Sequence, residues 1–388
     1  MDNCRLGQLL ISFGFWVWVG KDILALFLSN EVGLSKLGAV AAISMIAVFL
    51  GNYLGKRVNI KLRVAPIIFW LIGLVTMISV SILFYDVTAF SYFKFENLLV
   101  SIIMALIITR SIILNKIIHY QYFWWIGYIF GLLGGYLLFN FGDIDSYIGL
   151  RSLSVAHLNI QDYYAVLFLL AIFLYYSTNR RNILIIILSL LLCLPILYLF
   201  NSRMIPFTLG VSAFSMVGRK KLGKSLILVI LIFLMAHILL ESQPTIDNRL
   251  LSVFNENIFD IFISNPRYLS FEEAINNFTG NPFFGIGFGL FQIPGEDVDV
   301  SDRLSGVWPH NFFLELLAEM GVIGFVLIGV PVLVLFFNLL RGKCYKGFGY
   351  VVFIYTFLTY QLTHNLWYPL FWVGIFWTIF DNRMRDIK

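Results

Sequence analysis

The stretch that decides the fold is residues 265–325, which read NPRYLSFEEAINNFTGNPFFGIGFGLFQIPGEDVDVSDRLSGVWPHNFFLELLAEMGVIGF. It is the longest polar region of the chain, and nearly continuous apolar sequence precedes and follows it. This arrangement indicates a membrane protein with one large loop in water. Binding and catalytic residues concentrate in such loops, so we look for chemistry here first.

The composition excludes an ordinary soluble protein. Of the 388 residues, 60% are hydrophobic and only 13% are charged, and the mean hydropathy is +0.86. These values are typical of a polytopic membrane protein, whose surface contacts lipid. The net charge is only +5, and we expect no nucleic-acid partner.

The apolar segments predict about twelve transmembrane helices. A bilayer core about 30 Å thick requires about 20 mainly apolar residues per helix. That window places the helix centres near Trp18, Met45, Gly73, Leu106, Leu132, Leu170, Leu190, Gly210, Leu231, Ile328, Tyr355 and Val373. We therefore expect an all-α fold with about nine helices in residues 1–241, a large loop containing short helices in 242–321, and C-terminal transmembrane helices in 322–388.

The distribution of lysine and arginine predicts the orientation. Cytoplasmic loops retain positive charge, and basic clusters occur at alternate loops, in residues 56–63, 180–181, 219–224, 341–346 and 383–388. This alternation of basic and non-basic loops predicts that both termini are cytoplasmic and that the large loop lies on the opposite side of the membrane.

Local signals divide the large loop. Ser270 and Glu273 fit a capping box, which predicts a short helix from Ser270 through about Phe278, closed by Gly280. We expect a flexible turn at Gly285, Gly287 and Gly289, and an amphipathic helix over residues 312–320 that leads into the next span.

Few cations lie on the outer side of this topology: Lys36, Lys94, Arg151, Arg203, Arg249, Arg267 and Arg303. Arg203 follows a long apolar run, where a guanidinium is costly unless it faces water or an anion. It could bind phosphate oxygens in pairs, or it could simply extend to lipid headgroups. His310 could act as a general base near neutral pH, although a histidine before a helix is more often a helix-start residue.

Four motifs occur in a fixed order. They are Asn201-Ser202-Arg203, Asn265-Pro266-Arg267, Asn281-Pro282 followed by Gly285-Ile286-Gly287, and His310-Asn311 followed by Glu315, Gly321 and Gly324. This series resembles the bacterial O-antigen ligases and polymerases. The resemblance covers most of the chain in topology and residues 202–324 in motif.

The resemblance implies a GT-C-type glycosyltransferase of the bacterial inner membrane, with its active site facing the periplasm. The donor would be a glycan on undecaprenyl diphosphate, and the acceptor a hydroxyl of a lipid-linked unit or of lipid A-core. Arg203 and Arg267 would bind the diphosphate, and His310 would activate the acceptor. Arg151, His364 and Glu315 are further candidates. We expect no cofactor, and a chain-length regulator is a candidate partner.

Three alternatives stay open at this point. We favour a polymerase because the chain is compact with modest loops, but an O-antigen ligase would carry the same motifs. A flippase or other carrier should show two matched halves, and no such repeat is visible here. A divalent metal could bind Asp143 and Asp145, or Asp297 and Asp299, whereas the family resemblance implies a reaction without metal.

Overall fold

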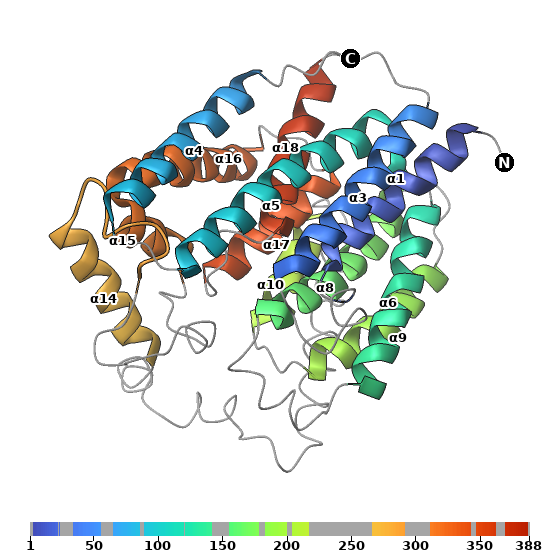
Figure 1. The fold of residues 1–388 in the computed structure, drawn as a ribbon. Helices are drawn as coiled ribbons and strands as arrows, with labels where there is room; N and C mark the ends of the chain where they lie inside the picture. Colours follow the sequence, from blue (N-terminus) through green and yellow to red (C-terminus); the bar gives the residue numbers. More distant parts are fainter. Residues whose placement is uncertain are drawn as a thin grey trace, which may run out of the picture.

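The structure, a computed structural model, describes residues 3–21, 23, 34–55, 65–85, 89–119, 121–141, 155–177, 183–199, 204–216, 266–291, 311–342, 347–361 and 369–386. All regular elements within these residues are helical (Figure 1). The helices are α1 (Asn3–Val19), α3 (Leu34–Leu54), α4 (Ala65–Phe84), α5 (Ala89–Leu114), α6 (Gln121–Phe141), α8 (Val155–Ser177), α9 (Ile183–Leu199), α10 (Met204–Ser215), α14 (Pro266–Gly280), α15 (Phe312–Gly324), α16 (Val330–Leu340), α17 (Phe348–Tyr360) and α18 (Pro369–Asp386). A 3-10 turn, Ile117–His119, follows α5, and a π-helix, η4 (Phe325–Gly329), joins α15 to α16.

The protein is a helical membrane protein. Within the described residues, four segments are long and apolar enough to cross a bilayer, namely Pro66–Phe84, Lys94–Leu114, Ile160–Ser177 and Phe312–Leu340. Eleven of the twelve centres expected from the sequence lie within described helices, and Leu231 lies outside the described residues. The number of twelve crossings and the cytoplasmic position of the termini stay predictions.

The helices differ in how deeply they are buried. In α8, 78% of the apolar window is buried inside the protein, whereas in α4 the share is 22%. A helix that is apolar on all sides and surrounded by other helices belongs to the core. We therefore place α8 at the centre of the bundle and α4 at its lipid-facing edge, where Phe69 and Phe84 are exposed.

Helices α1 and α3 pack closely through glycine. A Cβ atom built on Gly7 would lie 2.6 Å from the carbonyl oxygen of Gly51. Small residues allow helix backbones to approach in this way inside membranes, where lipid supplies no hydrophobic driving force between helices. Figure 1 shows these two helices side by side along the bundle.

The segment from α15 to α16 is helical almost throughout, but it contains two irregularities. Gly321, at the expected end of the large loop, leaves the helical conformation with φ 60° and ψ −161°. The π-helix η4 begins at Phe325, directly after the end of α15, and the indole of Trp70 in α4 donates a hydrogen bond to the Leu327 carbonyl at 2.6 Å. A π-bulge disturbs the helix ladder, and Trp70 bonds a backbone group at that point.

Candidate functional site

Helix α14 begins earlier than the sequence indicated. It starts at Pro266, so Ser270 lies inside the helix and is buried, and the predicted capping box at Ser270 is wrong. Proline suits the first helical position because its missing N–H would have had no partner there. The predicted end at Gly280 is confirmed. Arg267 lies in the first turn of α14.

The three glycines after α14 form a tight turn, which we call the glycine turn (residues 281–291). Gly285, Gly287 and Gly289 have φ values of 69°, 110° and 75°, a region that glycine adopts without steric penalty. The turn is anchored at two points, to Ser81 in the membrane helix α4 and to Tyr85, the residue directly after that helix. The Tyr85 hydroxyl donates to the Gly285 carbonyl at 2.9 Å, and the Phe288 N–H donates to the Ser81 hydroxyl at 3.0 Å.

The glycine turn inserts its backbone into the hydrogen-bond ladder of α15. Because Gly321 is not helical, the carbonyls of Ala318 and Glu319 lose their usual partners four residues ahead. The N–H groups of Ile286 and Gly287 donate to these carbonyls at 2.9 and 3.1 Å.

The exchange is reciprocal. The N–H of Val322 donates to the Pro282 carbonyl at 2.8 Å, and the N–H of Ile323 donates to the Phe283 carbonyl at 3.3 Å. Four bonds thus replace the helix bonds that Gly321 interrupts, so these backbone groups remain satisfied. The turn and α15 form one unit.

Asn311 caps the N-terminus of α15. Its side-chain oxygen accepts hydrogen bonds from the N–H groups of Phe313 and Leu314 at 3.0 and 3.1 Å, a geometry typical of N-caps. Its amide nitrogen donates to the carbonyl of Gln361, at the end of α17, at 3.1 Å. The expected helix start is therefore confirmed, and α17 holds it in place.

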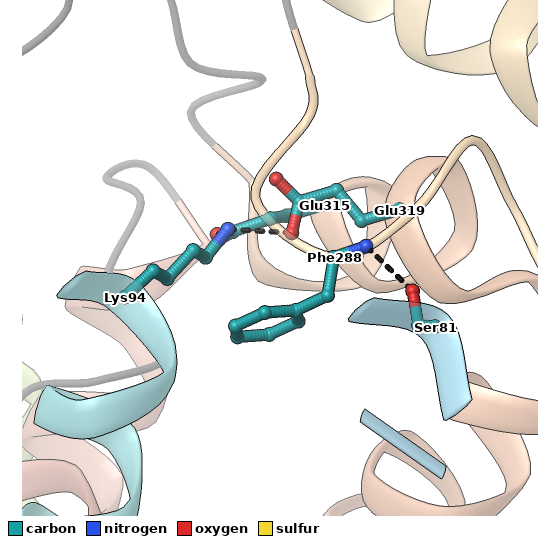
Figure 2. Close-up of polar contacts among 5 residues, drawn as sticks. All are labelled: Ser81, Lys94, Phe288, Glu315 and Glu319. Carbon is teal, nitrogen blue, oxygen red and sulfur yellow. Dashed lines mark hydrogen bonds and ion pairs between the residues drawn. The ribbon is translucent and has the colours of Figure 1, made fainter. Parts of the chain in front are cut away.

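A buried ion cluster joins α5 to α15. The Lys94 ammonium contacts Glu315 Oε1 at 2.5 Å and Glu319 Oε2 at 2.6 Å, and all three side chains are at most 1% exposed. Figure 2 shows Lys94 reaching from α5 toward the two glutamates, with the ring of Phe288 beside it. The ammonium lies 5.1 Å from the centre of that ring. The glycine turn therefore packs directly onto the cluster.

A comparison with known protein families finds a match in the part of the chain that contains α14, the glycine turn and α15. Residues 165–329, which include α14, the glycine turn, α15 and η4, match a family model described as O-antigen ligase. This match supports the assignment of residues 165–329 to the O-antigen ligase and polymerase superfamily. Searches of curated proteins and of solved structures return no match. Lys94, Ser81 and Tyr85 contact this O-antigen ligase domain from outside the matched residues.

The structure brings Glu315 into the site and places it in the ion cluster. The backbone of Arg267 lies in α14, and its side chain is outside the described part. The other sequence-based candidates and the four aspartates of the metal alternative also fall outside the described residues: His310, Arg203, Arg151, His364, Asp143, Asp145, Asp297 and Asp299. In sequence, His310 directly precedes the Asn311 cap, and Arg203 directly precedes α10.

Sequence reasoning missed a second polar cluster near the same helix start. Asp162 in α8 is buried and accepts hydrogen bonds from the hydroxyls of Tyr355 and Tyr360 at 2.8 and 2.9 Å. Tyr360 is adjacent to Gln361, which binds Asn311. An aspartate at the start of an apolar run was a usable signal, because intramembrane carboxylates require partners.

Proposed function

We propose that this protein is an O-antigen polymerase that transfers a glycan from undecaprenyl diphosphate to a hydroxyl of another lipid-linked unit. The observation that carries the proposal is the helix start fixed by Asn311, the residue that directly follows His310 in the sequence, within the residues that match the O-antigen ligase family. The family implies glycosyl transfer in O-antigen biosynthesis in general, and the remaining steps are argued from chemistry.

The proposed reaction is a single inverting displacement. The acceptor oxygen forms a bond to the anomeric carbon as the bond to the diphosphate oxygen breaks, and His310 takes the acceptor proton as general base. Negative charge grows on the leaving diphosphate, so fixed cations stabilise the transition state. We assign this role to Arg203 and Arg267.

The helix start supports the role of His310. The Asn311 side chain accepts hydrogen bonds from two N–H groups of α15 and donates one to the Gln361 carbonyl at the end of α17. His310 is therefore attached by its peptide bond to a residue that is held in place. A general base works only within hydrogen-bond reach of the proton it takes. A rigid attachment is therefore an advantage for a base at position 310.

The arginines can be tested by substitution with lysine. Arg203→Lys and Arg267→Lys keep the charge but lose the planar fork that binds two phosphate oxygens together. We expect each variant to lose most of its transfer activity while inserting normally into the membrane. Wild-type turnover in both would instead assign these residues to headgroup contact.

An O-antigen ligase is the second candidate, because the matching family model carries that description. Lipopolysaccharide from a deletion strain separates the two. A core bearing one repeat unit supports the polymerase. A core bearing none, with polymer retained on undecaprenyl diphosphate, would overturn it in favour of the ligase.

A further inference from the structure

The charge count of the ion cluster is unusual. Two carboxylates meet one ammonium, and none of the three side chains is exposed by more than 1%. Among the residues that the structure describes, Glu315 Oε2 and Glu319 Oε1 have no hydrogen-bond partner. Buried ion pairs give little net stability compared with apolar side chains of the same size, and in some proteins their role is to fix one arrangement of the chain.

The position of the cluster shows what it fixes. Glu315 lies one helical turn after the Asn311 cap, and its N–H donates to the Asn311 carbonyl at 2.9 Å. Glu319 lies one turn further, where its carbonyl accepts from Gly287. The two glutamates therefore face α5 between the cap at one end of α15 and the glycine turn at the other.

We propose that Lys94 is a positioning residue of the transfer site. By pairing with both Glu315 and Glu319, it holds the first two turns of α15 against α5, and so fixes the position of the Asn311 cap. Lys94 does not contact substrate, because its ammonium is buried and directed at the carboxylates. This inference rests on the proposed role of His310, which precedes the cap.

Removal of the Lys94 ammonium should lower kcat for glycan transfer. Lys94→Met leaves two adjacent carboxylates without a counter-charge, and their repulsion displaces the start of α15. A misplacement of about 1 Å lowers turnover by about 100-fold in enzymes that depend on orientation. We therefore expect kcat to fall by about that factor, while KM for the lipid-linked donor changes little.

Charge balance predicts a graded series of variants. Glu315→Gln or Glu319→Gln alone leaves Lys94 one carboxylate, so each should retain turnover within about threefold of the wild type. The double variant leaves the ammonium unpaired and should fall by at least about tenfold. The triple variant, Lys94→Met with both glutamines, has no charge to balance and should recover turnover to within about threefold. Glu96→Gln, an exposed carboxylate on the same helix, is the control and should match the wild type.

The experiment measures glycan transfer from undecaprenyl-diphosphate-linked glycan by the purified full chain in proteoliposomes, per folded molecule. Low kcat in Lys94→Met together with recovery in the triple variant supports the inference. Wild-type kcat in Lys94→Met would overturn it, and so would a folded triple variant as slow as Lys94→Met, because one of the groups would then act directly. His310→Ala, measured in parallel, tests the proposed function separately, since its full activity would overturn that mechanism whatever the Lys94 series shows.

Discussion

Glycine makes two different kinds of contact in this molecule, one between α1 and α3 and one between the glycine turn and α15. In the first, Gly7 keeps a helical backbone and only allows close approach to Gly51. In the second, Gly285 and Gly321 adopt positive φ values, and the backbones exchange hydrogen bonds. Packing alone specifies the first contact, whereas the second needs a backbone shape that other residues rarely adopt. The second contact lies in the O-antigen ligase domain, beside the proposed site.

The largest effect is expected at Gly321. Its φ of 60° and ψ of −161° lie in a region that is essentially restricted to glycine, where another residue costs about 1–3 kcal/mol. An added Cβ would also overlap the backbone of Phe283. Gly321→Ala should therefore disrupt the four-bond exchange, lower the thermal unfolding midpoint and reduce transfer by at least about 100-fold.

Gly280→Ala is the matched control, because nothing lies within 4 Å of a Cβ at that position. It should behave like the wild type in both measurements. Equal activity in the two variants would show that the backbone exchange has no role in transfer.

A smaller and different effect is expected at Gly7. A Cβ there would meet the backbone of α3, and overpacking of this kind costs about 1–3 kcal/mol. Gly7→Ala should lower the unfolding midpoint in detergent, but kcat per folded molecule should not change. Gly73→Ala, which has open space around it, is the control for stability. A lower kcat in folded Gly7→Ala would remove the distinction between the two contacts.

The smallest loss of stability is expected at the Asn311 cap. Asn311→Ala removes the cap acceptor and should destabilise the start of α15 by about 1 kcal/mol, with turnover reduced by roughly fivefold. Asn311→Asp keeps an acceptor for Phe313 and Leu314 but removes the donor to Gln361. Comparing the kcat values of these two variants separates capping from the link to α17, and wild-type kcat in both would exclude either role.

The sequence allowed the helices to be located because apolar runs of membrane length have few other solutions. The helix start at Asn311 could also be predicted, since asparagine before an apolar helix is a common cap. The start of α14 could not be placed in the same way. Ser270 and Glu273 have cap spacing, but Pro266 already provides a suitable first helical position, and the buried Ser270 lies within the helix.

The contacts of the site could not be predicted from local patterns. Lys94 was recognisable as a cation near an apolar run, but its partners lie more than 220 positions away, and helix packing decides which glutamates it meets. The backbone hydrogen bonds between the glycine turn and α15 could not be predicted for the same reason. Glycine patterns indicate an unusual backbone, and only the packed structure shows which groups it bonds.

The most direct test is glycan transfer by His310→Ala in proteoliposomes, with undecaprenyl-diphosphate-linked glycan as donor. The variant should insert and unfold like the wild type, because the helix cap belongs to Asn311 rather than to His310. Loss of the general base should lower kcat by about 100-fold or more. Wild-type turnover by a correctly inserted His310→Ala would contradict the proposed mechanism.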